Sequence, residues 1–239
     1  TDSFGNFSSV DSARINAAGQ VAFTHDLSTG GAASSAVAYP PPPGGGLTLL
    51  ARAAAPAPGT PGEFFSGAGF FSPQINTGGQ VAYLGELSNG DNVLYVDTTL
   101  VARDKAAAPG LAGLTLDQVG GAPTGGRVEL NDAGTTLFVS GLEGPGVTAA
   151  NNSVVYLGAN PIARTGSASP IAGATFAAFS GGDLALNDLN RVALVAQLAG
   201  GGISPLNDRA LLFWDGSGWQ LIAREGDPLA GSLIAGLVG

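Results

Sequence analysis

One nine-residue motif occurs four times in this chain of 239 residues and constrains its fold more than any other feature. Each copy, which we call the box, starts with an apolar residue followed by Asn. The copies are Ile15–Phe23, Ile75–Tyr83, Leu130–Phe138 and Leu186–Leu194. Successive box asparagines lie 60, 55 and 56 residues apart. A nearly constant period of this length indicates a repeat architecture.

The residue types of the box predict a tight turn that leads into a β-strand. An Asn side chain can turn its own backbone, and both Gly and Asn accept a positive φ at low cost. The asparagines are Asn16, Asn76, Asn131 and Asn187, and three residues later stand Gly19, Gly79, Gly134 and Asn190. A metal or ligand site made four times over is the alternative, but turn chemistry explains these residue types without one. We therefore interpret these eight residues as structural repeat positions.

Every unit has the same order of segments: a lead segment, the box strand, a middle strand and a strand ending in Ala-Arg, with Gly and Pro turns between them. No segment has a convincing helical period. We expect an all-β fold in which four tandem repeats of about four antiparallel strands form a single repeat domain over residues 1–239. The units are roughly 1–59, 60–110, 111–173 and 174–231. A four-bladed β-propeller is the favoured architecture, and a linear β-repeat array is the alternative.

The Ala-Arg pair is the second repeated signature. Its arginines are Arg52, Arg103, Arg164 and Arg224, which make up four of the eight Arg residues in the chain. A guanidinium donates five hydrogen bonds in a fixed fork. We interpret each Arg as a clamp on loop carbonyls or on a carboxylate of the next unit. The alternative is a ring of guanidinium groups around a central channel that holds an anion.

Composition excludes several classes of function. The net charge of −9 argues against a nucleic-acid partner, which requires a basic face. Hydrophobic residues make up 44% of the chain, yet no apolar run is long enough for a membrane span, so we expect no membrane insertion. With no Cys, the chain has no disulfide or thiolate chemistry. No charged-then-apolar leader starts at Thr1, so we expect any signal peptide to have been removed or to lie outside this sequence.

The C-terminal segment 232–239 resembles a fifth lead segment with no box after it. It follows Leu229-Ala230-Gly231 as the third lead segment follows Leu111-Ala112-Gly113. An apolar strand without a partner seeks a sheet edge. We therefore predict an assembly strand, formed by Leu233, Ile234, Leu237 and Val238, that completes a sheet of a second copy. The predicted partner is the chain itself, as a head-to-tail homopolymer. The alternative is that this sequence is a fragment of a longer chain and that further repeats follow the segment.

The box and the Ala-Arg pair together resemble the bacterial tandem-repeat surface proteins with an Asn-x-x-Gly-x-x-Ala-Phe motif. The match is close in the first copy (Asn16, Gly19, Ala22, Phe23) and the second (Asn76, Gly79, Ala82, Tyr83). The third copy has Leu137 in the Ala place, and the fourth has Asn190 and Leu194. The resemblance covers nearly the whole chain and implies an extracellular or cell-surface location. It implies no biochemical activity.

The sequence offers little catalytic chemistry, and we expect no catalytic, cofactor or metal residues. His25 is the only His and is expected to be exposed on a strand. Asp26 and Glu86 occupy the same place in their units, whereas Gly141 and Gln197 hold it in the other two. A glycosidase with paired carboxylates is an alternative on geometry alone. Asp215-Gly216 is interpreted as a hairpin turn. The leading hypothesis is a secreted structural or adhesive surface protein that is not an enzyme. One form of this hypothesis makes the chain the subunit of an extracellular filament assembled by terminal strand exchange. The alternatives are a propeller that binds surface glycans and a carbohydrate hydrolase.

Overall fold

The computed structural model describes residues 7–27, 34–39, 47–121, 126–229 and 232–234. Within these ranges the chain forms β-strands, turns and one short 3-10 segment, η1 (Val119–Gly121). The predicted all-β class, with sets of about four antiparallel strands, is confirmed.

Each predicted unit forms one antiparallel sheet whose strands pair in chain order. The first sheet contains β1 (Phe7–Ile15), β2 (Val21–Leu27), β3 (Ser34–Tyr39) and β4 (Thr48–Arg52). The second contains β5 (Phe65–Ile75), β6 (Val81–Leu87), β7 (Asn92–Val96) and β8 (Thr99–Arg103). The third contains β10 (Val128–Leu130), β11 (Thr136–Glu143), β12 (Ser153–Leu157) and β13 (Asn160–Arg164). The fourth contains β14 (Ala174–Leu186), β15 (Val192–Gly200), β16 (Arg209–Trp214) and β17 (Trp219–Arg224).

The lead strand of the third sheet is split in two. The strand β9 (Thr115–Asp117) pairs with the far end of β11, whereas β10 pairs with its near end. The 3-10 segment η1 lies between them in the sequence. In the second and fourth sheets a single long strand, β5 or β14, spans the same length with register shifts inside it. The third unit therefore keeps the pairing of the others while it diverts part of its lead segment out of the sheet.

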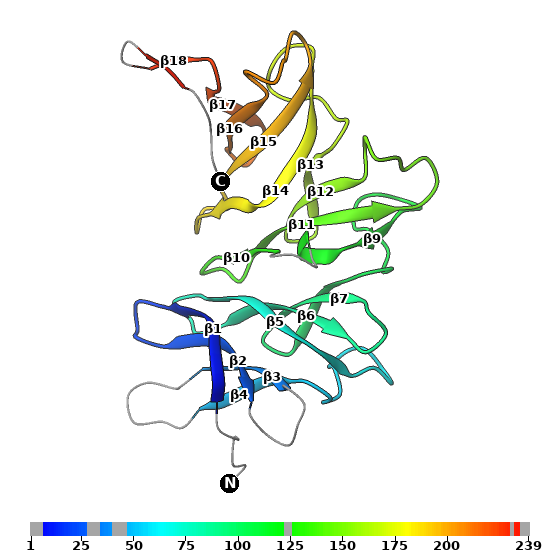
Figure 1. Ribbon diagram of the computed structural model, residues 1–239, viewed down its shortest axis with the longest axis vertical. Coiled ribbons are helices and arrows are strands. Elements are labelled where there is room, and N and C mark those ends of the chain that lie inside the picture. The colour runs from blue at the N-terminus through cyan, green and yellow to red at the C-terminus, as the bar shows by residue number, and fades with distance from the viewer. Residues whose placement is uncertain (1–6, 28–33, 40–46, 122–125, 230–231, 235–239) are drawn as a thin grey trace.

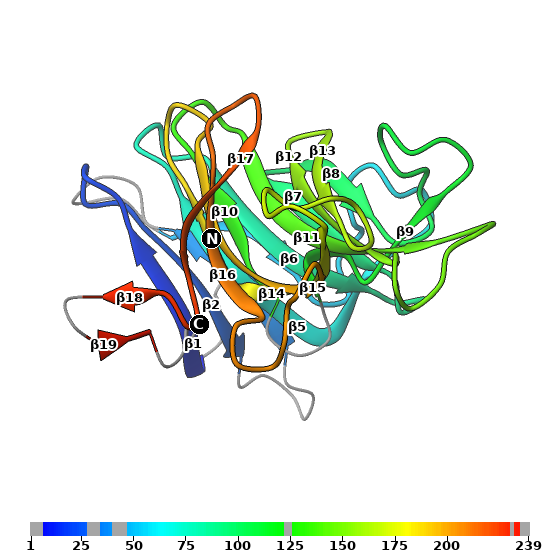
Figure 2. The same ribbon diagram turned by 90° about the horizontal axis from the view of Figure 1, so that it is seen from above.

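The four sheets follow one another along the long axis of the molecule in sequence order, with the first sheet and the fourth at opposite ends (Figure 1). Seen along that axis, strands of the second, third and fourth sheets overlie one another, and β1 and β2 lie to one side (Figure 2). Each sheet packs against the sheet that follows it in the sequence.

Three hydrophobic cores fill the spaces between successive sheets. The first joins Ala22 and Ala51 of the first sheet to Tyr83 and Tyr95 of the second. The core between the second and third sheets includes Leu84. The core between the third and fourth sheets contains alternate residues of β11 and β15, and both tryptophans pack against it. We call the side of a sheet that points to the next unit its forward face, and the other side its backward face.

Side-chain alternation along a strand explains how one sheet serves two cores. Successive residues of a strand point to opposite faces. In β6, Val81 and Tyr83 belong to the core with the first sheet, and Ala82 and Leu84 to the core with the third. All four are almost completely buried, so the strand is apolar on both sides.

The links between units share one hydrogen-bond pattern, and it is repeated after the fourth unit. Ala54 donates to the carbonyl of Phe65, and Phe65 donates back to Ala55. In the same way Gly226 donates to the carbonyl of Ile234, and Ile234 donates back to Asp227. This pairing encloses the short strands β18 (Pro228–Leu229) and β19 (Ser232–Leu233), which project beside the fourth sheet (Figure 1).

Candidate functional site

The box turns form one column that runs through all four units, and their geometry is nearly identical. In each turn the Asn Oδ1 accepts the backbone N–H four residues later, at 2.8 to 2.9 Å. The residue at Asn+3 donates its backbone N–H to the Asn carbonyl. The φ angles at that position are 79°, 83°, 77° and 57° for Gly19, Gly79, Gly134 and Asn190. The residue types of the box thus form the positive-φ turn that the sequence predicts.

The box asparagines also join neighbouring units, which the sequence did not reveal. The Nδ2 of Asn16 donates to the carbonyl of Asn76 at 2.8 Å. Asn76 donates in the same way to Asn131 at 3.1 Å, and Asn131 donates to Asn187 at 3.2 Å. Each Asn therefore shapes its own turn with Oδ1 and holds the next turn with Nδ2. We call this chain of contacts the asparagine ladder.

A second set of contacts reinforces the ladder. The backbone N–H of Thr77 donates to Asp132, and the N–H of Asp132 donates to Asp188. The side chain of Gln20 accepts from its own box Asn and lies over Gly79, where an added Cβ would stand 2.9 Å from Gln20 Oε1. Gly is therefore required at the second box for two reasons: its positive φ and the space that Gln20 occupies.

The ladder has two open ends within the described residues. Asn76 and Asn131 are each only 3% exposed, whereas Asn187 is exposed. The Nδ2 of Asn187 has no hydrogen-bond partner in the described part of the chain, and the carbonyl of Asn16 accepts only the N–H of Gly19 there. One end of the column thus offers a donor and the other an acceptor.

The arginines of the Ala-Arg pair lie at the ends of β4, β8, β13 and β17, and they do not share one environment. Arg103 donates through Nε and Nη2 to Asp91, at 2.9 and 2.7 Å, and lies 3.5 Å from Glu63. Arg164 donates instead to the carbonyl of Asn151 at 2.8 Å. Arg224 is 4.0 Å from Asp227, and Arg52 is exposed.

Arg164 binds a loop carbonyl, as one form of our interpretation expected. Arg103 binds a carboxylate of its own unit, which corrects the expectation of a carboxylate from the next unit. The last strand of each sheet runs antiparallel to the middle strand, so its final residue returns to the turn before that middle strand. Burial alone would raise the pKa of Asp91, but the hydrogen bonds from Lys105 and Arg103 hold that pKa below its ordinary value. This cluster fixes a hairpin turn in the second sheet.

Two buried tyrosines hold the Pro-Gly loop of the preceding unit, a role that sequence reasoning missed. The hydroxyl of Tyr95 donates to the carbonyl of Pro58 at 2.6 Å, and that of Tyr156 donates to Pro109 at 3.0 Å. Burial raises the pKa of Tyr156 to about 12. The recurrence of Tyr in the middle strands, one unit after each Pro-Gly, was the available signal.

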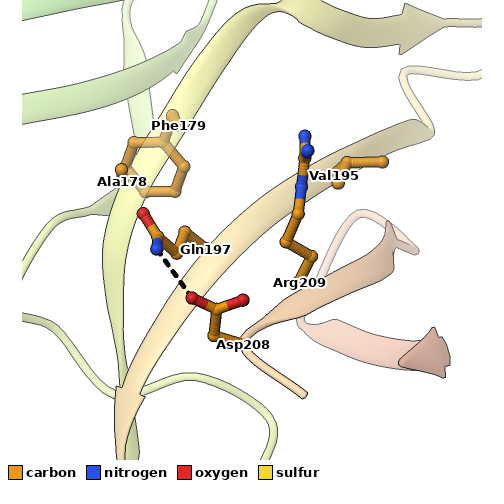
Figure 3. A pocket seen from close by; sticks show the side chains of 6 residues that line it. All are labelled: Ala178, Phe179, Val195, Gln197, Asp208 and Arg209. Atoms are coloured by element: carbon orange, nitrogen blue, oxygen red, sulfur yellow. Dashed lines mark hydrogen bonds between the residues drawn. The ribbon is translucent and has the colours of Figure 1, made fainter. Parts of the chain in front are cut away.

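The forward face of the fourth sheet carries a shallow hollow with a volume of about 260 Å³. Figure 3 shows its lining: Ala178, Phe179, Val195, Gln197, Asp208 and Arg209. Gln197 donates to Asp208 at 2.7 Å across the floor of the hollow. No sequence motif pointed to this place, because the hollow is formed by residues of three different strands and a loop.

The residues considered for catalysis are not brought together. His25 is fully buried beside Phe23, with ring centres 5.4 Å apart, and is not the exposed residue that we expected. Asp26 and Glu86 lie at equivalent places on different sheets, and Glu86 accepts a hydrogen bond from Ser66. Asp215 accepts from Ser217 and Gly218 in a hairpin turn, and those bonds lower its pKa.

The described ranges contain neither a metal site nor a membrane-spanning helix. No group of three or more His, Cys, Asp or Glu side chains there could hold a metal ion. No helix in that part of the chain is long and apolar enough to cross a membrane.

Of the four residues predicted to form the assembly strand, the structure describes only two. Leu233 belongs to β19, and Ile234 makes the junction pairing with Gly226 and Asp227. Leu237 and Val238 lie outside the described residues.

The repeat defines a class of protein: a chain of stacked antiparallel sheets whose box turns are hydrogen-bonded to one another. The chain belongs to a family described as DUF7453, a family of unknown function, whose model matches residues 1–100 and again residues 97–236. The first match covers the first sheet and most of the second, and the second match covers the third and fourth sheets. No curated protein matches this chain.

Proposed function

We propose that this chain is a structural or adhesive module of a secreted bacterial surface protein and a subunit of a filament that grows head to tail by exchange of a terminal strand. The resemblance of the box to surface repeats supports the extracellular location. The proposal makes the protein a scaffold with no catalytic role.

One observation carries the structural role: the repeated polar groups are used to connect units. The asparagine ladder joins each box turn to the next, and the tyrosine hydroxyls join each middle strand to the preceding loop. A side chain held in such contacts is unavailable to a substrate. The arrangement favours a stiff rod of stacked units.

The same contacts support a linear array over the four-bladed propeller. Closing a ring would require the fourth sheet to meet the first, and the donor of Asn187 to reach the carbonyl of Asn16. The two sheets stand at opposite ends of the long axis, and neither box group has that partner within the described residues (Figure 1). The unpaired groups at the two ends of the asparagine ladder therefore favour a linear array to which further units can be added.

The junction pairing of Ile234 supports strand exchange. It begins a fifth lead strand in the geometry of the three internal links. The test is deletion of residues 232–239, followed by electron microscopy and light scattering of the full chain and the truncated chain. We expect filaments from the full chain and none from the truncated one, and identical filaments from both would refute strand exchange.

A second candidate, glycan binding, rests on the hollow of the fourth sheet. Ala178 and Val195 offer apolar surface, and Gln197, Asp208 and Arg209 offer polar groups, a combination that suits a sugar. A glycan array probed with the full chain and with Gln197→Ala tests it. Loss of a specific signal in the variant would favour glycan binding, and the absence of any signal would exclude it. A carbohydrate hydrolase is the third candidate, and turnover of chromogenic glycosides that is lost in Glu86→Gln would support it.

A further inference from the structure

The two ends of the sheet stack carry the two halves of the interface that joins its units. We propose that the first sheet of a second copy of this chain stacks on the forward face of the fourth sheet, with the asparagine ladder continuing from one copy to the next. This inference rests on the proposed filament and names the surface through which its subunits meet.

The forward face of the fourth sheet repeats the pattern of a face that is covered elsewhere in the molecule. Position by position, Ala193, Val195 and Leu211 of the fourth sheet correspond to Ala82, Leu84 and Leu94 of the second. The residues of the second sheet are at most 1% exposed, because the third sheet lies on them. Their counterparts in the fourth sheet are half-buried. The fourth sheet thus has an apolar face without the cover that the same face has in the second.

The hollow of the fourth sheet marks where a following unit would enter. In the second sheet the corresponding region is covered by η1. The N–H of Val119 donates to Asp104 at 2.7 Å, and Gly120 packs directly against the side chain of Leu84. Leu84 corresponds to Val195, which lines the hollow. A space filled by the next unit inside the chain is therefore open at the end of the chain's stack.

On the backward face of the first sheet the positions beside the box are more exposed than their counterparts in the second sheet, whereas His25, farther along β2 on the same face, is fully buried. Val21 and Phe23 are half-buried, whereas their counterparts Val81 and Tyr83 are fully buried against the preceding sheet. Ile15 is 70% exposed, although its counterpart Ile75 packs into a core. This face has the residue types to cover a forward face.

The ladder supplies the register of the contact. Asn187 ends the column with an unused Nδ2 donor, and Asn16 begins it with a carbonyl that has room for one more donor. Stacking the first sheet of one copy on the fourth sheet of another brings this donor to this acceptor, as in the three internal steps. Such a contact joins two different surfaces, so each copy keeps one free face at each end and the assembly grows as an open filament.

The test uses single lysine variants of the full chain that block one face at a time. Val195→Lys places a charge on the forward face, and Ile15→Lys places one on the backward face. Both sites are accessible in the single copy, so each variant should have the same thermal midpoint as the parent at low protein concentration. Burying an unpaired charge in the contact should weaken association at least a hundredfold. Leu206→Lys, at a loop residue that is 84% exposed, is the matched control and should assemble like the parent.

Mixing the two blocked variants tests the direction of stacking. Val195→Lys keeps a working backward face, and Ile15→Lys keeps a working forward face. By analytical ultracentrifugation each variant alone should be a monomer, and an equimolar mixture should form a dimer that grows no further. Asn187→Asp retains the oxygen that shapes the turn but loses the donor, and we expect about tenfold weaker association, the equivalent of one hydrogen bond.

The outcomes separate this inference from the proposed function. If the parent forms filaments that Val195→Lys leaves intact while deletion of residues 232–239 abolishes them, strand exchange stands and face stacking is wrong. If Val195→Lys abolishes filaments that the truncated chain still forms, face stacking stands and strand exchange falls. A parent that remains monomeric at high concentration refutes both the filament and the stacking contact.

Discussion

The second and fourth sheets have the same strand order and the same box, yet they differ in burial. In β6 every side chain is buried except the half-buried Glu86. In β15 buried residues alternate with half-buried or exposed residues as far as Leu198, and the last two residues of the strand are exposed. The difference arises because the second sheet lies between two neighbours and the fourth has only one. Burial on both faces is therefore a property of position in the stack, and it is not encoded in the box.

The largest expected effect comes from truncating one position in both sheets. Leu84→Ala should lower the free energy of unfolding by about 2 to 5 kcal/mol, because it removes buried contacts and leaves a cavity against Gly120. Val195→Ala, at the corresponding place on the free face, should cost less than about 1 kcal/mol in the single copy. Urea titrations of both variants at low protein concentration measure the difference. Equal costs would mean that the forward face of the fourth sheet is covered.

The box glycines give a second comparison between an interior turn and an end turn. Gly79→Val should cost about 3 kcal/mol, since a β-branched residue is disfavoured at positive φ and the new side chain meets Gln20. Gly19 has the same backbone conformation with nothing near its added Cβ, so Gly19→Val should cost only the backbone strain, about 1 to 2 kcal/mol. Thermal melts of both variants supply the measurement. An unchanged midpoint for Gly79→Val would contradict the turn assignment.

The tyrosine that joins the second and third units predicts a sensitivity to alkaline pH. The pKa of Tyr156 is raised to about 12 in the folded protein, against an ordinary value of 10.0. Its contribution to stability is therefore complete below pH 10 and is lost as the pH rises to 12, by roughly 2 to 3 kcal/mol. Tyr156→Phe should be less stable at neutral pH and should show a smaller loss over that interval. Denaturant melts at pH 9, 10, 11 and 12 test this, and parallel pH curves for both proteins would show that another group controls the loss.

The smallest effect concerns the Ala-Arg clamps. Arg103→Lys should cost about 1 kcal/mol, since Lys cannot reproduce the paired hydrogen bonds to Asp91. Arg224→Lys in the fourth sheet should be nearly neutral, because Arg224 is 4.0 Å from its carboxylate. Thermal midpoints of the two variants make the comparison. If Arg103→Lys melts like the parent, this clamp does not stabilise the second sheet.

The sequence by itself determined the period, the strand classes and the turn chemistry. Asn and Gly at fixed spacing predicted the positive φ at Gly79, and the recurring apolar segments predicted four antiparallel strands in each unit, because both depend on local residue types and on patterning within a strand. No residue pattern indicated that Asn76 also holds the turn of the next unit, since that bond joins residues 55 apart.

Only the tertiary structure decided how the units are placed against one another. His25 is buried although a lone His on a strand favours exposure, because the packing of the first sheet encloses it beside Phe23. Arg103 binds its own unit, because the antiparallel return of β8 brings it back to Asp91. The partly exposed outer faces of the first and fourth sheets likewise correspond to no local residue pattern in the sequence. The repeat specifies how neighbouring sheets pack, whereas the placement of the sheets decides which sheet faces have no neighbour among the described residues.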